Sequence, residues 1–257
     1  MGTIIKTVGI VLSSVDFSDS DKILTVLTPN LGKISVMAKG VRKRRKENLG
    51  CTDLGVISNF VLFKGTKMYH LNESSIIESF YNIRLDYDKL VICTDILKEA
   101  NKYTEGIENI SEIYNIFKLT TYAIYGLLEN NYRYKNGVAV NEYDETQEKL
   151  KEEKDEIIYI TFMIKLLNII GFKLNLETLD IKEKELDNVS GNYDISSNVN
   201  GLVYIKSENI YVSINIYKIL RYIVNSDIEK VFKYKTNKEN IEKLKKFKEI
   251  YLENHIF

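Results

Sequence analysis

Apolar and polar residues alternate along much of the first eighty positions of the chain. Turn residues separate five segments of strand length, at residues 7–14, 22–28, 33–40, 55–65 and 67–80. Pro29 and Gly32 bracket the connection between the second and third segments, which predicts a β-hairpin there. Five short strands without a helical repeat predict a small closed or nearly closed β-barrel.

The apolar period becomes helical from Leu85 onward, which predicts a mainly α-helical second part. The helix at 156–170 is apolar nearly all round, so it should form the buried centre of a helical domain, and Gly171 should end it. The eight acids of residues 141–156 indicate a solvated loop or a helix start. The predicted helices are 85–103, 110–131, 156–170, 214–225 and 237–254.

The helical signal lapses over residues 187–213, which are rich in Asn, Ser and Gly and contain short β-like pieces. Asn200-Gly201 is a favoured hairpin turn. Lys165 and Asn168 interrupt the longest apolar run, whereas a membrane helix needs about 20 apolar residues, so no contact with a membrane is expected.

The 257 residues carry no net charge, but the charge is unevenly distributed. Residues 1–80 have a net charge of +4 and residues 81–257 a net charge of −4. The excess comes from residues 39–46, the basic segment, in which six of eight side chains are cationic. These are Lys39, Arg42, Lys43, Arg44, Arg45 and Lys46.

The basic segment has two interpretations. Most runs of charge are solvated surface loops, but like charges repel one another, and binding a polyanion relieves that repulsion and releases counterions. A small β-barrel next to the segment favours nucleic acid, because such barrels bind single strands across an open face. Lys33, Lys64 and Lys67 are candidates for extending the positive track. Five aromatic residues are candidates for stacking on bases, although packing in the core is the favoured role for each. They are Phe60, Phe63, Tyr69, Phe80 and Tyr81.

Catalytic motifs are lacking, so no enzymatic activity and no catalytic residue is predicted. Asp16, Asp19 and Asp21 are imaginable as a metal cluster, but a turn with local side-chain caps is favoured. Cys51 is expected to pack as a small apolar side chain. Two isolated cysteines and two histidines argue against a disulfide framework or a zinc site, and they fit a reducing cytoplasm. The lysine-rich run from Lys230 to Lys248 is predicted to be an ordinary amphipathic helix.

An ordered series of motifs in the first third resembles the RecO family of bacterial recombination mediators. The series comprises Gly9-Ile10-Val11-Leu12, Ser20-Asp21-Lys22, Thr28 with Leu31-Gly32-Lys33, and Ala38-Lys39-Gly40 followed by Arg42-Lys43. Residues 162–172 also resemble the central helix of that family.

The resemblance implies an α+β protein with an OB-fold β-barrel at residues 1–80 and a mainly helical domain at residues 81–257. It implies a non-enzymatic protein without a cofactor that binds single- and double-stranded DNA and anneals complementary strands in the bacterial cytoplasm, at the nucleoid. The implied partners are RecR and the C-terminal tail of the single-stranded DNA-binding protein, and the implied task is loading RecA. The expected DNA-binding residues are Lys33, Lys39, Arg42, Lys43, Arg44, Arg45 and Lys46.

Many members of that family carry two CxxC pairs, which this chain lacks. Leu179 and Lys182 stand about where the first pair would fall, and Asn200-Gly201 where the second would. Residues 187–213 are therefore expected to form a metal-free, degenerate zinc-finger-like region with a small β-hairpin. The apolar side chains expected to hold it are Val203, Ile205 and Tyr211.

Two rival functions remain at this stage. The first is a protein–protein adaptor whose basic segment docks on an acidic partner. The second, and more distant, is a metal-dependent nuclease that uses Asp16, Asp19 and Asp21.

Overall fold

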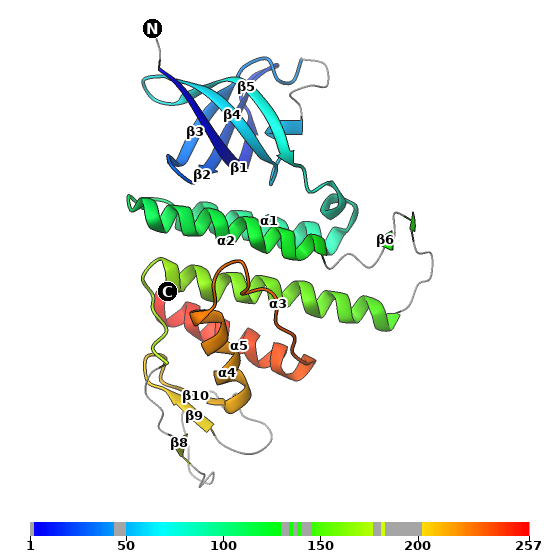
Figure 1. The fold of residues 1–257 in the computed structure, drawn as a ribbon, viewed down its shortest axis with the longest axis vertical. Helices are drawn as coiled ribbons and strands as arrows, with labels where there is room; N and C mark the ends of the chain where they lie inside the picture. The colour runs from blue at the N-terminus through cyan, green and yellow to red at the C-terminus, as the bar shows by residue number, and fades with distance from the viewer. Residues whose placement is uncertain are drawn as a thin grey trace. The chain divides into compact units, whose positions relative to one another are not determined.

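The computed structural model describes residues 3–43, 50–129, 134–135, 138–139, 145–176, 181–182 and 202–256. The chain forms two compact units, residues 1–145 and 146–257, whose elements are labelled in Figure 1. The first unit contains the barrel and two helices that follow it, so it extends beyond the expected OB-fold limit at residue 80. None of the helices in the described part of the chain is long and apolar enough to span a bilayer.

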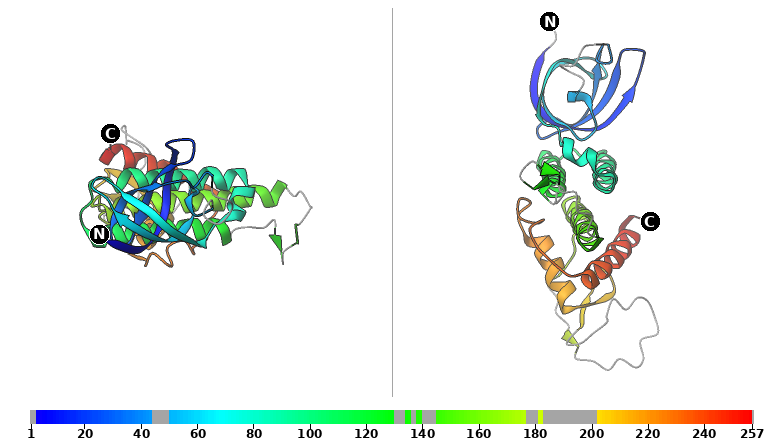
Figure 2. Two further views of the ribbon diagram at one scale, coloured as in Figure 1. Left: turned by 90° about the horizontal axis from the view of Figure 1, so that it is seen from above. Right: turned by 90° about the vertical axis from the view of Figure 1, so that its right-hand side faces the viewer.

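The first unit begins with a closed five-stranded barrel, seen as a ring in the right-hand view of Figure 2. The strand order is β1-β2-β3-β5-β4, and β4 pairs again with β1. All neighbours are antiparallel except β3 and β5, which pair in parallel. This order confirms the expected OB-fold barrel. The strands are β1 (Ile4–Asp16), β2 (Lys22–Thr28), β3 (Gly32–Ala38), β4 (Ile57–Lys64) and β5 (Tyr69–Glu78).

Strand β1 closes the barrel because it is long enough to pair with two neighbours. Its first half pairs with β4 and its second half with β2, and the register shifts between Val11 and Ser13. A side chain at Gly9 would come within 2.4 Å of Val26, so the close approach of β1 and β2 requires glycine there. The inward-facing core comprises Val11, Leu24, Val26, Ile34, Val36, Ala38, Val41, Phe60 and Leu62.

Two helices follow the barrel in the first unit, α1 (Tyr87–Tyr103) and α2 (Ile110–Glu129). The Asp86 carboxylate caps α1 by accepting the Lys89 amide. The turn between β2 and β3 lies against α2, since a side chain at Gly32 would come within 3.2 Å of Ile113. Short elements complete the unit: η1 (Gly50–Thr52), η2 (Tyr81–Leu85), β6 (Tyr134–Lys135) and β7 (Val138–Ala139).

The second unit is built around α3 (Glu145–Ile169), which is buried nearly all round over its apolar half, as predicted. Gly171 follows its end with a φ of 105°. Lys165 is accommodated because its ammonium donates to the carbonyls of Val224 and Ser226, at the end of α4. Burial lowers the pKa of Lys165. The other elements are β8 (Ile181–Lys182), β9 (Leu202–Ile205), β10 (Ile210–Ser213), α4 (Ile214–Asn225) and α5 (Lys238–Ile256).

The small hairpin of the second unit is formed by β9 and β10. Its turn occupies residues 206–209, with Asn209 at a φ of 54°. The turn expected at Asn200-Gly201 lies outside the described residues. Val203 and Ile205 are buried as expected. Tyr211 differs from the expectation, because it lies on the opposite face of the strand, where its ring is 4.8 Å from that of Tyr204.

From Lys238 onward the lysine-rich run forms the predicted amphipathic helix, whereas Lys230, Lys233 and Lys235 precede it. The apolar face of α5 is buried, and several of its lysines contact α3 within the second unit. Lys238 lies 3.6 Å from Glu153, Lys245 lies 2.6 Å from Glu156, and Lys248 lies over the Tyr159 ring.

Candidate nucleic-acid interface

The turn between β1 and β2, residues 17–21, is held by hydrogen bonds within the turn itself. The Phe17 amide donates to the Asp21 carbonyl at 3.0 Å. The Ser18 hydroxyl accepts the amides of Ser20 and Asp21 at 3.4 and 3.2 Å. This arrangement confirms the locally capped turn that the sequence favours over a metal cluster.

Asp21 joins this turn to the end of β3. Its Oδ1 atom accepts the Gly40 amide at 2.8 Å and the Ser20 hydroxyl at 2.9 Å. Both hydrogen bonds stabilise the charged carboxylate and therefore lower the pKa of Asp21. The bond from Gly40 has the larger effect, and the bond from Ser20 the smaller. Gly40 has a φ of 69°, a conformation that glycine adopts without a steric penalty.

Arg42 makes a second connection between the same two loops. Its amide donates to the Ser20 carbonyl at 3.1 Å, and its Nη1 donates to the Ser18 carbonyl at 2.9 Å. Its Nη2 lies 3.2 Å from the Asp16 carboxylate. The guanidinium charge of Arg42 is therefore partly compensated by the protein, and the start of the basic segment is fixed to the turn.

Lys39, Arg42 and Lys43 are all exposed at this place in the described part of the chain. Unlike Arg42, Lys39 and Lys43 form no ion pair with a described acidic side chain, so their charges are available to an anionic ligand. Arg44, Arg45 and Lys46 lie outside the described residues.

Lys33 was expected to bind DNA together with the basic segment, but it lies away from that segment in the structure. It starts β3, whereas Lys39 follows the end of that strand, about 20 Å away at the usual rise per residue. Its ammonium donates to the Asn101 carbonyl at 2.8 Å and lies 3.9 Å from Glu105. Its contacts therefore attach the barrel to the end of α1.

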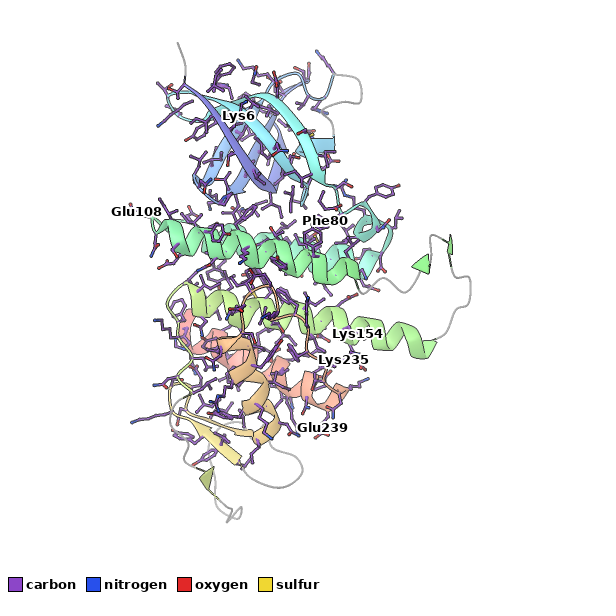
Figure 3. All side chains as sticks on the ribbon, in the orientation of Figure 1. Lys6, Phe80, Glu108, Lys154, Lys235 and Glu239 are labelled. Atoms are coloured by element: carbon purple, nitrogen blue, oxygen red, sulfur yellow. The ribbon has the colours of Figure 1, made fainter. Side chains whose placement is uncertain are left out.

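Two of the five aromatic stacking candidates are core residues. Phe60 is buried inside the barrel, and Phe80 is buried with its ring edge-on to Tyr125, at 4.9 Å (Figure 3). Phe63 and Tyr69 are half-buried, and Tyr81 is exposed in η2.

Phe17 is an aromatic residue at this site that the sequence interpretation did not select. Its side chain is 62 % exposed, and the neighbouring Val15 is exposed as well. It stands between Asp16 and Ser18, the two residues that bind the Arg42 guanidinium. The signal was present in the sequence as a large apolar residue inside a turn of acids and serines.

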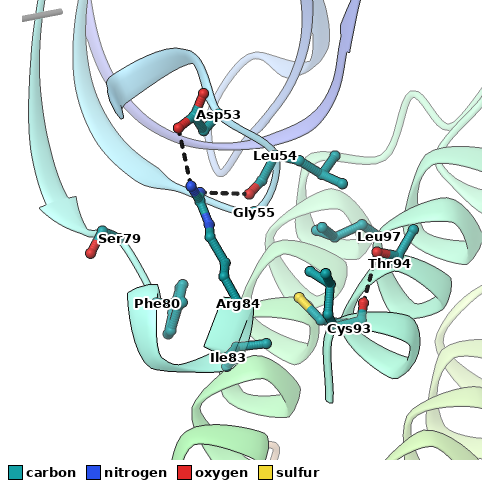
Figure 4. Close-up of a pocket in the computed structure, with 11 residues that line it drawn as sticks. Asp53, Leu54, Gly55, Ser79, Phe80, Ile83, Arg84, Cys93, Thr94 and Leu97 are labelled. Atoms are coloured by element: carbon teal, nitrogen blue, oxygen red, sulfur yellow. Dashed lines mark hydrogen bonds and ion pairs between the residues drawn. The ribbon is translucent and has the colours of Figure 1, made fainter. Parts of the chain in front are cut away.

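A cavity of about 300 Å³ lies elsewhere in the first unit, between the barrel and α1 (Figure 4). Arg84 crosses its mouth and donates to the Asp53 carboxylate at 3.1 Å and to the Leu54 carbonyl at 3.3 Å. The Cys93 thiol lines the cavity, and burial raises its pKa to about 12. Cys51 is buried too, so its predicted packing role is confirmed.

We expect neither thiol to act as a nucleophile in the folded protein, since the thiolate is the reactive form. Ellman's reagent at about pH 8 should modify Cys51 and Cys93 only after denaturant is added. Because the pKa of Cys93 is raised from 9.0 to about 12, its thiol contributes stability that is complete below pH 9 and is lost as the pH rises toward 12. Rapid labelling of the native protein by Ellman's reagent would contradict the expected protection of the two thiols.

The hairpin of the second unit is tied to α5 by a buried carboxylate rather than by cysteines. The Glu208 side chain has no exposed surface, and its oxygens lie 3.1 Å from His255 Nε2 and from Asn254 Nδ2. The Asn254 amide also donates to the Glu208 carbonyl. Groups of three or more metal-ligating side chains do not occur among the described residues.

Both parts of the chain match one protein family. Residues 1–80 match "Recombination protein O N terminal" and residues 142–257 match "Recombination protein O C terminal". The "DNA repair protein RecO" of Clostridium acetobutylicum is 30 % identical over 233 residues, covering 90 % of this chain and 84 % of the relative. The protein of the same name from Alkaliphilus metalliredigens is 26 % identical, covering 98 % of this chain and 94 % of the relative.

These matches, together with the closed OB-fold barrel, define the class of protein as one with an oligonucleotide-binding fold followed by a helical part. The chain belongs to the RecO family.

Proposed function

We propose that this protein is a DNA repair and recombination mediator without enzymatic activity. It binds single- and double-stranded DNA, anneals complementary strands and, together with RecR, helps to load the RecA recombinase. The single observation that carries the DNA-binding part is the pair of exposed lysines, Lys39 and Lys43, fixed beside the β1–β2 turn of an OB-fold. Membership of the RecO family supports the rest.

The mechanism is electrostatic and independent of DNA sequence. Cations of the basic segment contact phosphates and release the counterions condensed on the strand. Two DNA strands repel each other through their phosphates, so a protein that neutralises part of this charge lets complementary bases meet. No nucleotide hydrolysis is needed for such a step.

The proposed partners follow from the family. They are RecR and the C-terminal tail of the single-stranded DNA-binding protein, and the proposed location is the bacterial cytoplasm, at the nucleoid. Binding of purified RecR to the purified chain, measured by calorimetry, tests the first of these partners directly.

Strand annealing without ATP is the experiment that tests the proposed function. The wild-type protein should accelerate pairing of two complementary oligonucleotides, one carrying a fluorophore and the other a quencher. The acceleration should disappear as salt is raised, because counterion release then contributes less. Equal annealing rates with and without the protein at low salt would refute the proposal.

A second candidate function is that of a protein–protein adaptor whose basic segment docks on an acidic partner. A cluster of exposed apolar side chains at η2 and the start of α1 favours it, since large apolar patches often mark interaction sites. Binding of an acidic peptide, with no affinity for DNA, would support the adaptor. The cluster comprises Tyr81, Leu85, Tyr87, Leu90 and Val91.

A further inference from the structure

The β1–β2 turn holds a large aromatic side chain in solvent on a fixed backbone. Phe17 is 62 % exposed, although burying a phenylalanine is normally favourable. The backbone on both sides of it is fixed, because its own amide donates to Asp21 and the Ser18 carbonyl accepts from Arg42. The exposed ring is thus presented by an ordered turn rather than by a loose loop.

Hydrogen bonds also join the turn that carries the ring to the loop that carries the available positive charge. Asp21 binds the Gly40 amide, which directly follows Lys39, and Arg42 directly precedes Lys43. An exposed apolar ring on a turn that is bonded to a loop with two exposed lysines suits a ligand that alternates flat faces with anionic groups. Single-stranded nucleic acid has this chemistry, because each base offers a π-face and each linkage a phosphate.

We propose that Phe17 is a stacking platform for one base of a single strand, while Lys39 and Lys43 contact the phosphates on either side. Arg42 is a positioning residue in this arrangement, because its guanidinium is bound to Ser18 and Asp16. The proposal rests on the proposed DNA-binding function and names the residue that distinguishes a single strand from a duplex. In a duplex the bases are stacked and paired inside the helix, so Phe17 has no free base to contact.

The chain contains no tryptophan, which makes a direct test possible. Phe17→Trp introduces a single tryptophan at the proposed platform, which can be excited apart from the tyrosines, and a base stacked on the indole quenches its emission. Tyr81→Trp is the matched control, since Tyr81 is also 62 % exposed but lies in η2, outside the turn and the basic segment. The probes are an oligothymidylate of about 16 nucleotides, the upper site size of one OB-fold, and an abasic strand of equal length.

Emission of Phe17→Trp should fall when the oligothymidylate binds and change little when the abasic strand binds. Emission of Tyr81→Trp should change with neither strand. Phe17→Ala should weaken single-strand binding about tenfold and leave duplex binding unchanged. Unchanged emission of Phe17→Trp at saturating oligothymidylate, or equal affinity of Phe17→Ala and wild type for the single strand, would overturn the inference.

The role of Arg42 has its own readout. Arg42→Ala should reduce the quenching of Phe17→Trp, because the turn loses its attachment, while the salt slope of binding stays nearly constant. Lys43→Ala should do the opposite, lowering the slope by about 0.7 for the lost phosphate contact and preserving the quenching. A slope that falls equally in both variants would make Arg42 a phosphate ligand and overturn its positioning role.

Failure of this inference can be told apart from failure of the proposed function. Binding of labelled DNA to the wild-type chain is measured separately by fluorescence anisotropy. No binding of either DNA strand would overturn the proposed function itself. Binding of DNA without quenching at Phe17→Trp would leave that function standing and remove only the stacking platform.

Discussion

Replacing Arg42, Lys43, Arg44 and Arg45 together with alanine should weaken binding to single-stranded DNA on the order of 100-fold at about 0.1 M salt. Each phosphate contact contributes about 0.7 to the slope of log affinity against log salt, which is about fivefold in affinity at that salt. Three of the four cations are expected to contact phosphate, so the slope should fall by about 2. The substitutions also cancel the net charge of +4 carried by residues 1–80.

A matched variant separates local contact from overall charge. Lys218, Lys233, Lys235 and Lys246 are exposed in the second unit, and their replacement with alanine removes the same number of charges. This control should keep nearly the wild-type salt slope. If the basic-segment variant kept the wild-type slope and affinity, the segment would be ruled out as the main DNA contact. If both variants lost affinity equally, the overall charge of the protein, and not local contact by the basic segment, would explain DNA binding.

His255→Ala should destabilise the hairpin of the second unit by about 3 kcal/mol. It removes one of the two side chains that hydrogen-bond the fully buried Glu208 carboxyl, and a buried polar group that loses its partner costs about 1–3 kcal/mol, more if the group is charged. The effect should be local, because Glu208 belongs to the hairpin turn and His255 to the end of α5. Amide hydrogen exchange of residues 202–213 measures it, since exchange there should become faster.

Two further variants make this result interpretable. Lys230→Ala disrupts an exposed ion pair with Asp227 and should cost less than about 1 kcal/mol. Combining Glu208→Gln with His255→Ala removes the buried charge itself, so the double variant should lose less than the sum of the single variants. Additive losses would show that the two side chains act independently and that no charge is buried between them.

A closed or nearly closed barrel was predictable from local patterns, but the strand pairing that closes it was not. Alternating apolar residues locate all five strands, and Pro29 with Gly32 locates the hairpin between β2 and β3. The parallel pairing of Val36 with Tyr69, between β3 and β5, joins strands far apart in the sequence. No local periodicity encodes such a pairing, whereas the family resemblance implies it.

The candidate site was predictable in its charge but not in its geometry. Lys39 and Lys43 are recognisable as a cluster of cations because they lie within five positions of each other. The bond from Arg42 to Ser18 spans 24 positions, so the sequence could not show that this arginine is already engaged. Lys33 was grouped with the cluster for its charge alone, although the length of β3 separates them.

The hairpin of the second unit is fixed by the burial of one of its faces. Val203, Ile205, Ile210 and Val212 alternate along β9 and β10 and are buried, which fixes the register of the two strands around the turn at residues 206–209. A one-residue slip would expose these apolar side chains. The sequence shows the alternation but no favoured two-residue turn pair at residues 206–209, so the position of this turn was not predictable from turn residues.

The attachment points of the basic segment also bear on how such a protein can evolve. Gly40 and Arg42, which fasten it to the β1–β2 turn, both precede residue 44. Insertions, deletions or exchanges of cations after Lys43 would therefore leave these bonds intact. The affinity for a polyanion and the shape of the surface that binds it can then change separately, by different mutations.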